Sequence, residues 1–170
     1  MKKRFLVAGI GNIFFGDDGY GVEVVRELLL GSVPENAHVV DFGIRSFDLA
    51  YALMDGYEEV ILIDAAFRGE PPGTVYLIQI ETSQAGGTQP VDGHTINVTS
   101  VLQLVSAFGG VTGRLHLVGC EPDILETDQI GLSPRVQAAV PKGVAMVREL
   151  IAQFVGVSDV GQKDARYKDA

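Results

Sequence analysis

The stretch GIGNIFFGDDGYG, from Gly9 to Gly21, decides how this chain is interpreted, because five glycines and two adjacent aspartates directly follow an apolar run. The run Phe5–Ile10 is typical of a buried strand. A helical pattern begins near Gly19, with its apolar side chains on one face and its charged ones on the other. The sequence therefore predicts a strand, a loop and a helix, with the loop at the carboxyl end of the strand.

The loop does not match either common phosphate-binding pattern. A dinucleotide fingerprint needs a third glycine where this chain has Phe14. A P-loop reading of GNIFFG would need lysine and a hydroxyl residue where the chain has Asp17 and Asp18. Two carboxylates would repel phosphate, so the loop is interpreted as presenting Asp17 or Asp18 to a cation or a polarised water. The alternative is that Asp17 only caps the helix and Asp18 only interacts with its dipole.

The rest of the chain alternates between strand-like and helix-like segments, the pattern of an α/β fold. Helical spacing follows Asn97, and Ser133-Pro134 predicts the start of a last helix that Pro141 should kink or divide. We expect three layers: a twisted, mostly parallel sheet of about five strands with helices on both faces. The predicted strands are Phe5–Ile10, Val39–Phe42, Val60–Ile63, Val75–Ile80 and Leu115–Gly119.

One strand is expected to run against the others. The link from Asp64 to Thr74 contains Pro71, Pro72 and Gly73, and it is too short for a helical crossover. Val75–Ile80 should therefore be antiparallel and lie at an edge of the sheet. The parallel strands then end at one common edge, where open α/β sheets bind their ligands.

Length, composition and charge narrow the possible functions. The chain has 170 residues, of which 46% are hydrophobic, and a net charge of -9. This predicts one globular domain over residues 1–156, followed by a polar, loose tail over 157–170.

The excess of acidic residues argues against a nucleic-acid partner. The apolar segments are too short to span a bilayer and the start lacks a signal-cleavage site, so we expect a cytoplasmic protein without a membrane partner.

His38, His116 and Cys120 are not expected to be functional. Both histidines fall within strand-like segments, where a structural role is the commoner one. Cys120 is the chain's one cysteine, so it cannot form an internal disulfide. It also lacks the sequence signature of a nucleophile.

Polar side chains of three segments are expected to meet at the carboxyl edge. Asp64 and Asp41 each end a parallel strand, although such aspartates often only cap turns. His94 precedes the helix that leads to the last parallel strand, which returns it to the side of Asp18 and Asp64. Two carboxylates and an imidazole suit a divalent ion such as nickel, zinc or cadmium.

The chain resembles the endopeptidases that mature nickel-iron hydrogenases, from about Arg4 to Phe154. The motifs that carry the resemblance are GIGNIFFGDDGYGV, ILIDAA, DGHTINVTSVL, LVGCEPD and GLSPRV. The combination is specific, although each motif alone is weak. The resemblance implies that Asp18, Asp64 and His94 bind metal and carry the reaction.

The resemblance also implies a substrate. It points to a protease that removes the C-terminal extension of the hydrogenase large subunit precursor after nickel insertion and recognises the nickel already held by that precursor. Zinc or cadmium would then occupy the site only in vitro. Two departures bear on this: many members have glutamate where this chain has Asp18, and Asp-Gly-Gly-Thr or similar where it has Asp41-Phe42-Gly43-Ile44. The neighbouring Arg45 either contacts substrate or, as we expect, only covers the surface.

Two other classes of function stay open at the level of sequence. One is a metallopeptidase or other hydrolase that holds its own divalent ion. The other, which ranks last, is a nucleotide-binding α/β protein with a degenerate loop. The maturation protease is the favoured interpretation.

Overall fold

The computed structural model describes residues 4–81, 98–125 and 128–166, with side chains described up to residue 156. Its five strands fall at the places predicted from sequence. The elements are β1 (Phe5–Ile10), η1 (Gly16–Gly19), α1 (Tyr20–Leu30), β2 (Ala37–Gly43), α2 (Ser46–Leu53), β3 (Glu59–Ala65), β4 (Val75–Ile80), α3 (Val98–Ala107), β5 (Arg114–Cys120) and α4 (Pro134–Arg166).

The five strands form one sheet in the order β2-β1-β3-β5-β4. β1 pairs in parallel with β2 and β3, and β3 pairs in parallel with β5. β4 is antiparallel to β5 and lies at the edge, as the short proline-containing link predicted. The mixed sheet confirms the predicted fold class, and β1, β2, β3 and β5 all end at one edge, called the carboxyl edge below.

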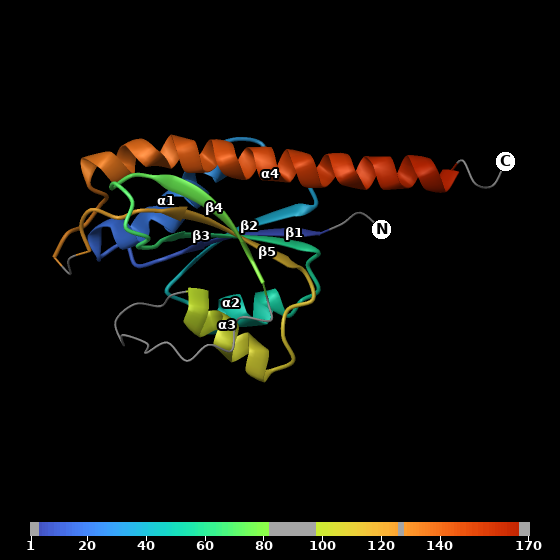
Figure 1. Cartoon of the computed structure of the whole chain (residues 1–170), viewed down its shortest axis with the longest axis horizontal. Coiled ribbons are helices and arrows are strands. Elements are labelled where there is room, and N and C mark those ends of the chain that lie inside the picture. Colours follow the sequence, from blue (N-terminus) through green and yellow to red (C-terminus); the bar gives the residue numbers. More distant parts are fainter. Residues whose placement is uncertain (1–3, 82–97, 126–127, 167–170) are drawn as a thin grey trace.

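Helices cover both faces of the sheet (Figure 1). Alternate residues of β1 enter two separate cores: Phe5 and Val7 pack beneath α1 and α4, while Leu6 and Ala8 face α2 and α3. β1 is buried along its whole length because it lies between β2 and β3 and both of its faces are covered by helices. This three-layer arrangement holds the ends of β1 and β3 in fixed positions at the carboxyl edge.

Two glycines of the opening stretch allow α1 to pack directly on the sheet. A Cβ at Gly21 would overlap the carbonyl oxygen of Ile63 and lie 2.5 Å from that of Ile10. A Cβ at Gly9 would lie 2.5 Å from the carbonyl oxygen of Gly21. These glycines therefore serve close helix–strand packing.

The last helix differs from the prediction in two respects. α4 continues through Pro141 as one helix, so the expected division there is wrong (Figure 1). Proline removes one hydrogen bond, but residues on both sides of it, including Val140 and Val147, are buried against the same core. The helix also extends to Arg166, into the polar segment from residue 157 that was expected to be a loose tail.

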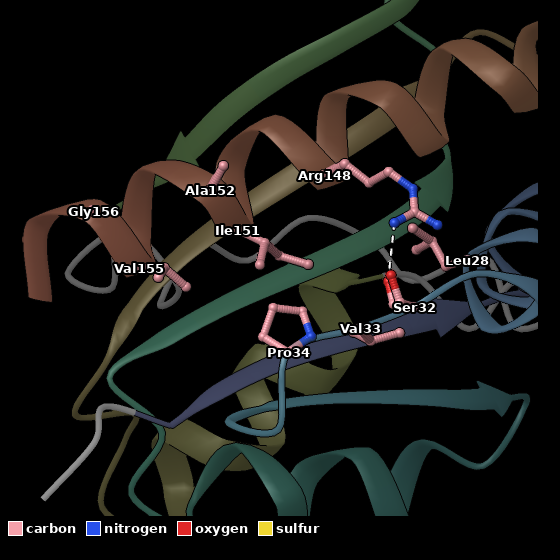
Figure 2. Close-up of a pocket in the computed structure, with 9 residues that line it drawn as sticks. All are labelled: Leu28, Ser32, Val33, Pro34, Arg148, Ile151, Ala152, Val155 and Gly156. Atoms are coloured by element: carbon pink, nitrogen blue, oxygen red, sulfur yellow. Dashed lines mark hydrogen bonds between the residues drawn. The ribbon is translucent and has the colours of Figure 1, made fainter. Parts of the chain in front are cut away.

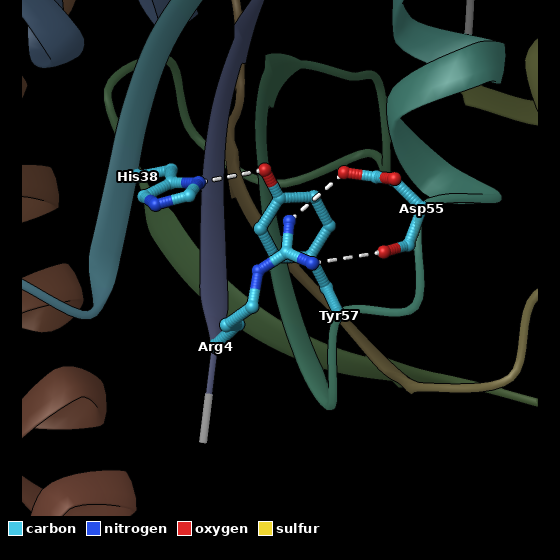
Figure 3. Close-up of polar contacts among 4 residues, drawn as sticks. All are labelled: Arg4, His38, Asp55 and Tyr57. Carbon is cyan, nitrogen blue, oxygen red and sulfur yellow. Dashed lines mark hydrogen bonds and ion pairs between the residues drawn. The ribbon is translucent and has the colours of Figure 1, made fainter. Parts of the chain in front are cut away.

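Polar contacts stabilise the opposite edge of the sheet, where the parallel strands begin; we call it the amino edge. His38 Nδ1 lies 2.8 Å from the Tyr57 hydroxyl, and the Arg4 guanidinium covers the Tyr57 ring while it bonds to Asp55 (Figure 3). On the neighbouring strands, buried Glu59 binds Arg114 and His116, with His116 Nε2 at 2.8 Å from Glu59 Oε2. Both histidines thus have the structural role expected for them.

No helix in the described part of the chain is both long enough and apolar enough to cross a membrane.

Candidate functional site

Asp18 and Asp64 come from different segments and lie close together at the carboxyl edge. Asp64 is the second-to-last residue of β3, and Asp18 is in the short helix η1 that follows β1. Both are buried: 7% of the surface of Asp18 and 4% of that of Asp64 is exposed. Burial, and then the negative charge of Asp18, raise the pKa of Asp64 well above its ordinary value, while the Ala65 backbone N–H partly opposes the rise. The two carboxylates therefore interact electrostatically, as the strand-end argument predicted.

Asp64 has an oxygen that the protein leaves unpaired. Its Oδ1 is fully buried and has no hydrogen-bond partner among the residues that the structure describes. A buried carboxylate oxygen without a donor is costly, and it is stabilised by a proton or by a cation. This oxygen, beside a second buried carboxylate, fits a divalent cation.

Asp18 is held by the backbone of its own loop. Its Oδ2 accepts a hydrogen bond of 2.7 Å from the Asn12 N–H. Burial raises the pKa of Asp18, and the Asn12 N–H partly opposes that rise. Gly11 has a φ of 133°, and a Cβ there would overlap the Asp18 carbonyl oxygen. The loop can close over Asp18 because residue 11 is glycine.

Asp17 has a different role from its neighbour. It is completely buried, and its carboxylate accepts bonds from the backbone N–H groups of Asp123, Ile124 and Ser133 and from the Ser133 hydroxyl. It does not cap the helix, because its partners are more than 100 positions away in sequence. The loop pattern by itself did not distinguish Asp17 from Asp18, whereas the family resemblance selected Asp18. The bonds of Asp17 explain why it is structural, and the electrostatic interaction with Asp64 is made by Asp18.

The third predicted ligand, His94, lies outside the described residues. Within the described ranges, no three histidine, cysteine or acidic side chains gather into a possible metal site. The structure thus brings together the two carboxylates of the predicted set, and the contribution of His94 stays a prediction.

A small pocket lies next to the Asp18 loop. It has a volume of about 190 Å³, and Asn12, whose N–H binds Asp18, is part of its wall. Asp41 also lines it, so this strand-end aspartate belongs to the same edge. The lining residues are Gly11, Asn12, Ile13, Phe14, Val22, Arg26, Asp41, Gly43 and Ile44.

Arg45 supports the loop that borders this pocket. Its guanidinium donates to the carbonyl oxygens of Asp41 and Phe42 and forms an ion pair of 3.2 Å with Asp48. These bonds hold the turn after β2 in place.

A second pocket is remote from the aspartates. It has a volume of about 470 Å³ and lies between the C-terminal end of α1 and α4, where Arg148 bonds to the Ser32 carbonyl oxygen (Figure 2). Its other walls are mostly apolar, including Leu28, Ile151 and Val155. Because α1 begins at the carboxyl edge, its far end lies at the amino edge, and this pocket is not part of the aspartate site.

Cys120 is unsuited to act as a nucleophile. It is buried in the core beneath α4, and burial, followed by the charges of Asp17 and Glu121, raises the pKa of its thiol to about 12. The reactive form of cysteine is the thiolate, which such surroundings disfavour. The sequence-based expectation for this residue agrees with its environment.

Tyr76 and Glu121 border the site and were missed by sequence reasoning. The Tyr76 ring lies against Gly119, the β5 partner of Asp64, and its hydroxyl donates to the Ala66 carbonyl oxygen at 2.8 Å. Glu121 is buried and accepts a hydrogen bond of 2.7 Å from the Arg68 N–H. Both side chains support the segment that follows Asp64. A tyrosine on an edge strand carries no sequence signal for that role.

Known proteins with similar sequences and folds include hydrogenase maturation proteases. A family model described as "Hydrogenase maturation protease" matches residues 22–150. The hydrogenase 2 maturation protease of Escherichia coli K12 is 30% identical over 146 residues, which cover 85% of this chain and 88% of that protein.

Solved structures agree with the sequence comparison. The hydrogenase maturating endopeptidase HybD of E. coli superposes with a TM-score of 0.75 at 27% identity, covering 88% of this chain and 93% of that one. The hydrogenase 2 maturation peptidase from Thaumarchaeota archaeon SCGC_AB-539-E09 has a TM-score of 0.68 at 32% identity, covering 88% and 99%. With its fold, its paired buried aspartates and these matches, the chain belongs to the hydrogenase maturation protease family.

Proposed function

We propose that this protein is the endopeptidase that removes the C-terminal extension of a nickel-iron hydrogenase large subunit precursor in the cytoplasm, after nickel has been inserted. Asp18, Asp64 and His94 bind the nickel that the precursor holds, so the metal is part of the substrate. The observation that carries the proposal is the buried, unpaired Oδ1 of Asp64 beside Asp18. Membership of the maturation protease family supports the class of reaction.

The chemistry follows from the state of the two carboxylates. Without a cation, burial and mutual repulsion favour a shared proton on the pair. When the nickel of the precursor arrives, its charge stabilises both carboxylates, and that proton is released. A carboxylate beside the scissile peptide can then accept a proton from an attacking water, and binding to nickel orients the peptide.

Exposed apolar side chains around the site fit a protein substrate. Phe14, Ile44, Phe67 and Ile130 follow β1, β2, β3 and β5 respectively, and all four are more than half exposed. We call these four residues the apolar rim. Phe14 and Ile44 line the same pocket, and the residue before Ile130 accepts a backbone bond from Gly16. Apolar side chains gathered at one edge are typical of a surface that binds another protein.

A metallopeptidase with its own ion is the second candidate, and the same pair of carboxylates supports it. The two functions differ in where the metal resides. Two buried carboxylates and one further ligand are an open site, so the free maturation protease should bind divalent ions weakly.

The test mixes chelator-treated protein with nickel-free and nickel-loaded precursor and follows loss of the C-terminal extension by mass spectrometry. The proposal expects cleavage of the nickel-loaded precursor alone. Equal cleavage of both precursors contradicts nickel recognition. Activity that returns only after the protease is preloaded with zinc favours the independent metallopeptidase.

A further inference from the structure

The turn that carries Asp18 is fastened to a distant loop of the chain. η1 has only four residues, too few for a helix to be stable by itself. Its backbone is bonded to the loop between β5 and α4: the Gly16 N–H donates to the Gln129 carbonyl oxygen at 2.7 Å, and the Asp17 N–H donates to that of Ile124 at 2.8 Å. The position of the turn is therefore set from outside.

The Asp17 side chain completes this attachment. Among the residues that the structure describes, four hydrogen bonds of 2.7 to 2.9 Å reach its carboxylate, and all come from the loop between β5 and α4, which ends at Ser133. A fully buried carboxylate with four donors is strongly and specifically held. Asp17 thus joins the loop to the residue directly before Asp18.

We propose that Asp17 is a positioning residue that holds Asp18 in the orientation required for the reaction, by fastening η1 to the loop between β5 and α4. This inference rests on the proposed function of Asp18. The role follows from chain connectivity: a change at Asp17 shifts η1, and the bond from the Asn12 N–H to Asp18 Oδ2 shifts with it.

The test compares two buried carboxylates at opposite edges of the sheet. Asp17→Asn keeps the shape of the side chain but places an NH₂ group against backbone donors. Glu59→Gln is the matched control, because Glu59 is also buried and multiply bonded but lies at the amino edge beside Arg114 and His116. Both variants should lower the melting temperature.

Kinetics separate positioning from stability. Asp17→Asn should lower kcat for precursor cleavage by about 10- to 100-fold, the loss typical of changing a residue that orients a metal ligand. Glu59→Gln should leave kcat unchanged in the folded protein. Unchanged kcat in folded Asp17→Asn, or an equal loss in Glu59→Gln, overturns the proposal.

A spectroscopic measurement keeps the test independent of the assay. In ¹H–¹⁵N correlation spectra, the Asn12 amide reports its bond to Asp18. Its resonance should move in Asp17→Asn and stay in place in Glu59→Gln; an unmoved resonance overturns the proposal even if the wild-type protein cleaves no precursor. If Asp17→Asn does not fold, Ser133→Ala removes one bond to Asp17 and should give a smaller shift in the same resonance and a smaller loss of kcat. No change in Ser133→Ala then overturns it.

Discussion

At the scale of single residues, two adjacent aspartates have opposite environments. The carboxylate of Asp17 accepts four hydrogen bonds from described residues. Asp18, by contrast, forms a buried pair with Asp64, and the Oδ1 atom of Asp64 has no hydrogen-bond partner among the described residues. Such a pair destabilises the free protein, because both carboxylates lose hydration and repel one another. The two carboxylates proposed to bind a cation therefore lower the stability of the cation-free protein.

Replacing the Asp64 carboxylate should separate stability from activity. Because its folded pKa lies above the ordinary value of 3.8, the folded state binds the proton more tightly than the unfolded state does. Stability should therefore fall as the pH rises from about 4 towards the folded pKa. We predict that Asp64→Asn reduces this dependence, part of which remains because burial also raises the pKa of Asp18. The variant should also raise the melting temperature by a few degrees at neutral pH and abolish precursor cleavage.

Thermal melts from pH 4 to pH 8 and a processing assay measure both effects. Asp41→Asn is a suitable comparison for the melts, because Asp41 is also acidic and near the site but is only partly buried. A lower melting temperature for Asp64→Asn than for the wild-type protein at pH 7 would contradict the argument.

Cys120 should be dispensable for the reaction. We predict that Cys120→Ala retains kcat within about twofold and loses about 1 kcal/mol of stability, because a small buried side chain is shortened. In the native wild-type protein, iodoacetamide should modify the thiol slowly at pH 8, since its pKa is raised to about 12. Loss of cleavage in a well-folded Cys120→Ala variant would revive a thiol mechanism.

At the scale of secondary-structure elements, the start of α1 is where packing is tightest. The helix meets β1 and β3 through Gly21, where a Cβ would overlap backbone oxygens. Backbone atoms cannot move aside as a flexible side chain can. The glycines of this stretch resemble those of a nucleotide-binding loop, but they serve to let α1 pack closely on the sheet. This close packing brings η1 near the end of β3.

Alanine substitutions at two helical glycines measure this constraint. Gly21→Ala should destabilise the protein by about 3 kcal/mol or more, because overpacking forces α1 off the sheet. Gly156→Ala, in α4, meets no atom within 4 Å and should be neutral or stabilise by about 0.5–1 kcal/mol. Urea denaturation gives both values, and equal effects would show that close packing at Gly21 is unimportant.

At the scale of the whole molecule, the two edges of the sheet have different characters. Ion pairs and histidine contacts lock the amino edge, while the carboxyl edge carries the aspartate pair, the small pocket and the apolar rim. A chain with a net charge of -9 that exposes apolar side chains around its site is suited to bind its substrate through apolar contact.

Apolar rim variants should weaken substrate binding without affecting the fold. We predict that Phe67→Ser and Ile130→Ser each raise KM for the precursor by about fivefold or more, which corresponds to about 1 kcal/mol of lost contact, with little change in kcat. Leu30→Ser is the control, since Leu30 is 82% exposed but lies at the end of α1 near the opposite edge. A similar KM for all three variants and the wild-type protein would exclude the rim as a substrate surface.

Local pattern was sufficient for most of the fold. Apolar runs predicted all five strands, and a link too short for a crossover predicted the antiparallel edge strand β4. Because parallel strands end at one edge, their order along the chain was also enough to bring Asp18 and Asp64 together. Covalent connectivity and strand direction decide these features, and both can be read from sequence.

Only the tertiary structure showed why Asp17 is a structural residue, and only tertiary contacts kept α4 continuous through Pro141. The partners of Asp17 lie on a loop more than 100 residues away, so no local pattern contains them. Likewise, burial on both sides of Pro141 outweighs its intrinsic tendency to break a helix. The sequence determined which residues reach the carboxyl edge, and long-range contacts determined which carboxylate there is used for structure and which faces the site.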